Sequence, residues 1–288
     1  MKFSVFATAV VALAGAASAV PAADGENWTY KTNAAGLASP NNWATVAAAC
    51  GGKRQSPINI ATKGSGKAKA PLEFSGKCPK YTVSQTYDSY KATVDGGSCN
   101  VKANGKTYSF AQVHFHSPSE HTLNGKALDG EVHFVHTNED GSIAVVGLFL
   151  QRNASATNGA ADSYIAKFLK QLPKSNTKTP VAADLYVYAA LTGGHDSNRW
   201  KHSLTTVGTF HSAVRSAVSR GKVFNYPGSL TTPGCSEVVD WWVVERPVAI
   251  SNADFNAIRT QLKRVAATND GKNARPVQPL NGRVISIY

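Results

Sequence analysis

Histidines cluster in the middle of this 288-residue chain, where five of the eight lie between positions 114 and 136. They include a His-x-His motif at His114 and His116 and a Glu-x-His motif at Glu131 and His133. Neutral imidazole is a common zinc ligand, and three nitrogen ligands with one open position are typical of a catalytic rather than a structural zinc. The spacing therefore predicts a catalytic metal site.

The elements that would carry these histidines are two short β-strands, expected at 111–116 and 131–137. Side chains two residues apart on a strand point to the same face of the sheet, so His114 and His116 project together. If the second strand pairs antiparallel with the first, His133 completes a site of three nitrogens. The alternative is a polar strand whose histidines are satisfied by ordinary hydrogen bonds, as most lone histidines are.

Two neighbours of these histidines have side chains suited to orient them. A metal-bound histidine usually donates its other ring N–H to an acceptor. Gln112 and Glu131 each lie two residues from a proposed ligand and on the same face, so we expect them to be acceptors. His121 and His136 lie off this register, and we interpret both as structural hydrogen-bonding residues.

The remaining pattern predicts a predominantly β protein with two surface helices. Further short runs typical of strands, separated by Gly, Pro, Asn and Asp, occur at 81–83, 91–94, 143–150, 185–191 and 238–245. Apolar residues at helical spacing predict a helix over 163–172. Ser251, with Asp254 three residues later, has the form of a capping box and predicts a second helix from 251.

Four segments, taken in order along the chain, together resemble the α-class carbonic anhydrases. They are the QSPIN run at 55–59, the histidine set from 114 to 133 with the SEH run at 119–121, the YPGSLTTP run at 226–233 and the NARPVQPL run at 273–280. The likeness extends from about Trp28 to the C-terminus. It implies one domain, a large twisted, mainly antiparallel sheet with small peripheral helices, and reversible hydration of CO2 to bicarbonate and a proton.

The resemblance also implies which residues perform the chemistry. A zinc ion would be held by His114, His116 and His133. Zinc lowers the pKa of bound water to about 7, so that hydroxide can attack CO2 at neutral pH. The outer N–H groups of the ligands would donate to Gln112, Glu131 and the backbone carbonyl of Asn273.

Two further sets of residues follow from the same resemblance. Thr231 would donate its hydroxyl proton to the buried carboxylate of Glu120 and keep its lone pairs to orient the hydroxide. An apolar wall beside the metal would hold uncharged CO2, although the same side chains could simply pack the core. This substrate pocket is expected at Val135, Val145, Leu230, Thr232, Val239 and Trp241.

The proton path departs from the family pattern. The position that usually offers a shuttle histidine falls within 87–90 and best matches Tyr90, and no histidine occurs before Gln112. The reference pKa of tyrosine, near 10, is about three units from that of a donor water near 7, so we expect proton transfer to limit turnover. The alternative donors are His195, His202 and His211.

A competing hypothesis is a catalytically inactive, carbonic-anhydrase-like binding module. Such relatives typically lack a zinc-ligand histidine, whereas this chain has all three. A zinc peptidase is disfavoured because the chain has no His-Glu-x-x-His motif. We therefore expect a zinc lyase that binds CO2, bicarbonate, inhibitory anions and sulfonamides.

The composition excludes other classes of protein. Charged residues make up 17% of the chain, against about 25% in typical globular proteins, which argues against a disordered charged chain or a coiled coil. The net charge is +12 at pH 7. The basic residues are nevertheless scattered, and their densest patches lack interleaved aromatic residues, so nucleic-acid binding is not expected.

The N-terminus predicts secretion. A largely apolar run over 3–16 precedes an A-x-A cleavage pattern at Ala17 and Ala19, so residues 1–19 are expected to be a signal peptide and 20–288 the carbonic anhydrase domain. The apolar run is too short for a membrane anchor, and the C-terminus has no hydrophobic tail for a lipid anchor. The expected location is extracellular, or periplasmic in a bacterium.

The even number of cysteines fits an oxidising compartment. The four cysteines allow three pairings, and none has the spacing of a zinc or redox motif. The resemblance implies a disulfide between Cys50 and Cys235, which leaves Cys78 and Cys99 for a second. Possible N-glycosylation follows from the Asn-x-Ser/Thr sequons at Asn27 and Asn153.

Overall fold

The structure is a computed structural model that describes residues 27–63, 72–153, 168, 171–174, 180–184 and 222–288. Its strands are β1 (Asn59–Ile60), β2 (Glu73–Gln85), β3 (Tyr90–Ala103), β4 (Lys106–His116), β5 (Thr122–Leu123), β6 (Lys126–Ala127), β7 (Gly130–Thr137), β8 (Ile143–Arg152), β9 (Val181–Asp184), β10 (Val223–Gly228), β11 (Val239–Ile250) and β12 (Ser286–Ile287). Its helices are η1 (Pro40–Thr45), η2 (Ala48–Gly51), η3 (Leu172–Lys174) and α4 (Asn252–Leu262).

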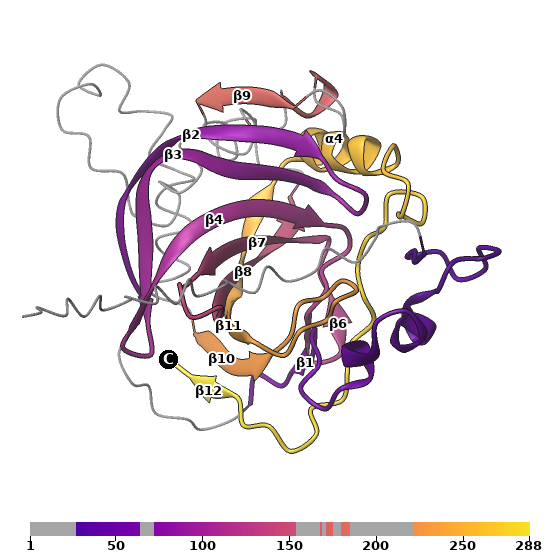
Figure 1. Cartoon of the computed structure of the whole chain (residues 1–288), viewed down its shortest axis with the longest axis horizontal. Coiled ribbons are helices and arrows are strands. Elements are labelled where there is room, and N and C mark those ends of the chain that lie inside the picture. Colours follow the sequence, from indigo (N-terminus) through magenta and orange to yellow (C-terminus); the bar gives the residue numbers. More distant parts are fainter. Residues whose placement is uncertain (1–26, 64–71, 154–167, 169–170, 175–179, 185–221) are drawn as a thin grey trace, which may run out of the picture.

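Nine of these strands form one large sheet, in the order β12-β10-β11-β8-β7-β4-β3-β2-β9. Neighbouring strands are antiparallel except β8 and β11, which run parallel. Figure 1 shows β2, β3 and β4 curving over the middle strands, with α4 near one end of the sheet. The prediction of a predominantly β fold with a mainly antiparallel sheet is confirmed.

Two cores lie on opposite faces of the middle strands. On β8, Val146 and Leu148 belong to the larger core, whereas Val145 and Phe149 belong to the second one. Successive side chains of a strand point to opposite faces, so a strand covered on both sides reads as a continuous apolar run. This explains the pattern at 143–150, which β8 contains.

The helix α4 begins as the sequence predicts. Ser251 is its N-cap, and its hydroxyl accepts from the backbone N–H of Asp254 at 3.0 Å and donates to Asp254 Oδ2 at 2.8 Å. One face of the helix packs against the larger core through Phe255, Ile258 and Leu262.

Two predicted elements fall mostly outside the described residues. They are the helix over 163–172 and the strand over 185–191. Of the first, the described part contains Phe168, which is buried and stacks on Phe115 with ring centroids 5.0 Å apart, and the start of η3.

The hairpin of β2 and β3 is longer than the sequence patterns indicated. The predicted strands at 81–83 and 91–94 are only the parts of it with regular apolar alternation. Two register shifts occur on either side of Lys80. A bulge moves the following side chains to the other face, which breaks the two-residue period by which a strand is recognised.

Two disulfides stabilise the fold. One joins Cys50 in η2 to Cys235 in the loop between β10 and β11, with the Cα atoms 4.9 Å apart. The other joins Cys78 to Cys99 across the β2–β3 hairpin, with the Cα atoms 5.7 Å apart. Both expected pairings are present, and they indicate an oxidising compartment. None of the helices in the described ranges has the length and apolar character that a bilayer crossing requires.

Candidate metal centre and active site

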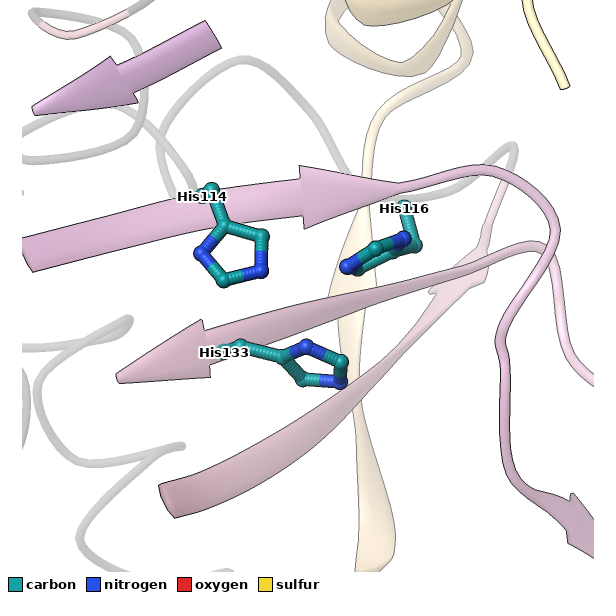
Figure 2. A group of neighbouring side chains, drawn as sticks. All are labelled: His114, His116 and His133. Atoms are coloured by element: carbon teal, nitrogen blue, oxygen red, sulfur yellow. The ribbon is translucent and has the colours of Figure 1, made fainter. Parts of the chain in front are cut away.

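The three predicted ligand histidines lie side by side on β4 and β7. His114 and His133 are directly opposite each other in the antiparallel register of these strands, and His116 follows on the same face of β4. Figure 2 shows the three rings turned toward a common space. One ring nitrogen of each lies within 4.8 Å of those of the other two. The expected antiparallel pairing is confirmed, and it brings the three imidazoles together.

Each imidazole is oriented by one acceptor on its outer side. His114 Nδ1 is 2.8 Å from Gln112 Oε1, His116 Nδ1 is 2.7 Å from the backbone oxygen of Asn273, and His133 Nε2 is 3.0 Å from Glu131 Oε1. An oxygen acceptor requires an N–H donor, so the outer nitrogen of each ring carries the proton. The inner nitrogens are therefore His114 Nε2, His116 Nε2 and His133 Nδ1, each with a free lone pair.

Burial keeps all three rings neutral. It lowers the pKa of His116 and His133 and lowers that of His114 well below its usual value, and the neighbouring imidazoles of the cluster lower the pKa of His114 and His133 further. A histidine can bind a metal only through an unprotonated nitrogen. The site thus presents three lone pairs at neutral pH.

A zinc ion fits this donor set. His116 Nε2 is buried and has no hydrogen-bond partner among the described residues, although it points into the cluster. A buried polar atom without a partner costs free energy, which a metal ligand bond would recover. Three neutral nitrogens leave a fourth tetrahedral position open.

Glu131 connects the ligand set to the protein interior. Its Oε1 also lies 2.8 Å from His121 Nδ1, and its Oε2 accepts the backbone N–H groups of Glu120 and His121, both at 2.9 Å. Burial alone would raise the pKa of Glu131, but its electrostatic interactions and hydrogen bonds with His121 and His133 outweigh burial and hold this pKa well below its usual value. Glu131 is therefore an ionised acceptor that fixes the orientation of His133.

Gly147 on β8 explains why the carboxylate of Glu131 has room. A Cβ at this position would lie 2.8 Å from Glu131 Oε1, closer than van der Waals contact allows. The sequence analysis missed this glycine. Its only signal is a glycine inside an otherwise β-branched and apolar run, which often marks a close approach.

The other two histidines of the 114–136 cluster have hydrogen bonds, as predicted. His121 Nε2 is 2.6 Å from the hydroxyl of Tyr226, which donates to Ser56 Oγ at 2.9 Å. His136 Nδ1 is 3.3 Å from the backbone oxygen of Ala144. Burial lowers the pKa of His136 to about 3, so this ring is neutral in the folded protein.

Glu120 lies under the ligand histidines. Its Oε1 accepts the backbone N–H of Arg275 at 2.9 Å, and its Oε2 is 3.5 Å from His116 Nε2. Burial raises the pKa of Glu120 to about 7, and the nearby hydroxyl of Thr231 is among the groups that lower it. No hydrogen bond of 3.5 Å or less joins Thr231 to Glu120 in the described residues, and Oε2 has no other partner there. The expected hydrogen bond between them stays a prediction.

Comparison with known proteins identifies this arrangement. A family model for eukaryotic-type carbonic anhydrase matches residues 38–288. This chain belongs to that family. A carbonic anhydrase of Pectobacterium atrosepticum is 28% identical over 273 residues, which cover 92% of this chain and 92% of the relative.

Solved carbonic anhydrase structures have the same fold. The α-carbonic anhydrase of Thermovibrio ammonificans, in complex with the inhibitor sulfanilamide, is 28% identical with a TM-score of 0.65 and covers 90% of this chain and 98% of its own. The fungal α-carbonic anhydrase of Aspergillus oryzae is 27% identical with a TM-score of 0.66 and covers 89% and 94%. The protein is thus a zinc-dependent carbonic anhydrase, which interconverts CO2 and bicarbonate.

The residues expected to form the CO2 wall of this carbonic anhydrase lie in the second core. The ring of Trp241 is 4.8 Å from that of His133, and its Nε1 donates to the backbone oxygen of Ser229 at 2.9 Å. Thr232 is half-buried in the adjoining loop. The same cluster contains, fully or partly buried, Val135, Val145, Leu230 and Val239. These four pack the core, and their contact with substrate stays a prediction.

Tyr90 does not face the site, which corrects the expectation for the shuttle position. In the register of β3 and β4, Lys91 is opposite His114 and Thr93 is opposite Gln112. Tyr90, one residue away, points to the other face, where it is only 2% exposed in the larger core and donates to Gln85 Oε1 at 3.0 Å. Matching by motif could not say which side chain of this segment faces the ligands, because that depends on the register of β3 and β4.

Proposed function

We propose that this chain is a secreted enzyme that hydrates CO2 with His114, His116 and His133 as its zinc ligands. One observation carries the assignment of ligands. Three imidazoles, of which His114 is partly buried and the other two are buried, each have an acceptor on the outer nitrogen and an inner nitrogen directed at the same space. In a histidine cluster with only a structural role, the inner ring nitrogens would instead have hydrogen-bond partners in the protein.

The protein residues around the ion have distinct roles in this proposal. When bound, zinc lowers the pKa of a coordinated water from 15.7 to about 7 and so supplies a nucleophile at neutral pH. Thr231 donates its proton toward Glu120, which leaves the hydroxyl lone pairs to accept from the nucleophile and orient it. Gln112, Glu131 and Asn273 hold the ligand rings in their tautomers.

The substrate pocket separates neutral from charged species. CO2 has no charge, and it can displace weakly held water from an apolar wall at Val135, Val145, Leu230, Val239 and Trp241, with Thr232 at the edge. Bicarbonate is an anion and would leave toward the side of the site where Gln112 and His114 are only partly buried.

Inhibition should follow from the same site. The relative from Thermovibrio ammonificans was solved with sulfanilamide, and one from Chlamydomonas reinhardtii with acetazolamide. We expect sulfonamides and small inorganic anions to inhibit this chain by occupying the open zinc position.

Secretion fits the two disulfides. The proposed signal peptide, 1–19, lies outside the described residues and precedes the proposed domain of 20–288. Asn27 and Asn153 are both exposed, so each could carry a glycan in a host that glycosylates.

The decisive experiment measures zinc content and CO2 hydration on the same preparations. We expect one zinc per chain, hydration that a sulfonamide abolishes, and loss of both zinc and activity in His116→Ala, because two imidazoles leave an incomplete coordination shell. Lys102→Met, a change at an exposed position of β3, is the control and should match the wild type. Full activity in metal-free protein or in His116→Ala would overturn the proposal.

A further inference from the structure

Lys91 is a charged side chain on the same face of the sheet as the zinc ligands. It stands directly opposite His114 in the β3–β4 register, and directly opposite residues share a face. Its side chain is 32% exposed, and its Nζ lies 3.8 Å from Asp88 Oδ1. An ammonium group therefore lies at the edge of the metal site, in contact with water.

Asp88 holds this ammonium without covering it. The carboxylate is buried and accepts from Thr86 Oγ1 at 2.9 Å. Burial alone would raise the pKa of Asp88, but the charge of Lys91 and the hydrogen bond of Thr86 keep it below its usual value, so this carboxylate is ionised at neutral pH. Because the carboxylate is buried and the ammonium is partly exposed, an anion approaching from solvent meets the positive group first.

The field of Lys91 extends to the ligands. Lys91 is directly opposite His114, and His116 follows two residues later on the same face of β4, so the charge of Lys91 shares a face with both ligands. The interaction of two unit charges falls off only as the inverse of their separation. An anion bound at the open zinc position, next to these rings, would experience the same charge, whereas CO2 has no net charge to respond.

We propose that Lys91 raises the affinity of the zinc site for small monovalent anions, bicarbonate and inorganic inhibitors alike. This rests on the proposed function, since the anion is taken to bind beside the three histidines. Asp88 is the positioning residue that keeps the ammonium at the rim. Partial compensation by Asp88 and by solvent limits the effect to about threefold to tenfold in affinity at low salt.

The test uses thiocyanate as the probe anion and zinc-loaded protein. Calorimetric titration compares the wild type with Lys91→Met, which removes the charge, and Lys91→Arg, which keeps it. Lys102→Met is the matched control, because Lys102 lies on the same strand, is exposed and pairs with Glu73 at 3.9 Å. We expect Lys91→Met alone to bind thiocyanate about threefold to tenfold more weakly at about 10 mM ionic strength. The difference should shrink at about 0.5 M, where charges are screened over less than 5 Å.

The outcomes separate this inference from the proposed function. If the wild type contains zinc and hydrates CO2, but Lys91→Met binds thiocyanate as tightly as the wild type at low salt, the role of Lys91 is wrong. Equal weakening by Lys91→Arg, or a loss that does not depend on salt, would show that packing and not charge is responsible and would also overturn it. A wild type without zinc or hydration would instead refute the proposed function.

Discussion

Single residues decide the protonation state of the site. The ligand rings are neutral because they are buried, and their tautomers follow from one outer acceptor each. Glu120 beneath them has a raised pKa for the same reason, burial, whereas Glu131 remains ionised through its contacts with His121 and His133. Two carboxylates with different environments can therefore have different roles a few residues apart.

The hydroxyl of Thr231 can be tested separately from metal binding. Thr231→Ala should retain zinc while the hydration rate falls roughly a hundredfold to a thousandfold, the range for one oriented catalytic hydrogen bond. Thr231→Ser, which keeps the hydroxyl, should recover most of the rate. Stopped-flow hydration together with metal analysis measures both quantities, and a wild-type rate in Thr231→Ala would rule out the orienting role.

His136 should make the folded state sensitive to acid. Its folded pKa of about 3 lies below the unfolded value, so the unfolded chain takes up the proton first as pH falls. The stability that neutral His136 contributes is fully present above about pH 6.5 and is lost progressively down to about pH 3. Between pH 7 and 4.5 this loss amounts to about 2 to 3 kcal/mol.

Denaturant unfolding at the two pH values measures this contribution. His136→Gln, with no group that titrates in this range, should show a smaller fall in the free energy of unfolding than the wild type. Parallel falls in the two proteins would contradict the assignment to His136, whatever the absolute stability of the variant.

Elements determine which side chains can reach the reacting atoms. Because side chains alternate on β3, Lys91 and Thr93 share the face of His114, while Tyr90 and Ala92 are buried in the larger core. A side chain of β3 can therefore accept a proton from the site only if it belongs to the set of alternate positions that face His114.

This alternation gives a sharp test of proton release. With no histidine at the mouth among the described residues, we expect hydration to be limited by proton transfer and to rise strongly with imidazole buffer. Thr93→His places an imidazole on the site's face at an exposed position and should reduce the buffer dependence. Tyr90→His places it in the core and should not.

Hydration rates across a series of buffer concentrations distinguish these cases. His195, His202 and His211 lie outside the described residues, and a shuttle among them would give a rate that is already high and flat at low buffer. That result, or an equal effect of Tyr90→His and Thr93→His, would contradict the prediction.

At the scale of the whole molecule, distant segments meet at the site. The loop at 226–233 supplies Thr231, the segment at 273–280 supplies the carbonyl that orients His116, and the disulfide from Cys50 to Cys235 spans 185 residues. The active site is therefore assembled only when these distant segments have come together in the fold.

The long disulfide should contribute more stability than the short one. Restriction of the unfolded chain grows with loop length, which gives about 5 kcal/mol for the Cys50–Cys235 loop and about 3 kcal/mol for the Cys78–Cys99 loop, separated by 185 and 21 residues. Double Cys→Ser variants of each pair, compared by denaturant unfolding, measure the difference. Equal losses would contradict the chain-entropy explanation, and peptide mapping without reduction that joined Cys50 to Cys78 would contradict the pairing.

The sequence by itself determined the chemistry of the site and the class of the fold. The His-x-His and Glu-x-His spacings place the ligands on one face because the two-residue period of a strand is local. The continuous apolar run at 143–150 and the cap at Ser251 are local signals of the same kind. Such features depend on a few consecutive residues, and each of them is found in the structure as predicted.

Only the tertiary structure decided what surrounds the ligands. That Lys91 rather than Tyr90 faces His114 depends on the register between β3 and β4, which is not continuous but shifts between Thr93 and Asn100. The space that Gly147 leaves for Glu131 depends on a third strand. Register and close approach are properties of pairings between segments far apart in the chain, and no local period contains them.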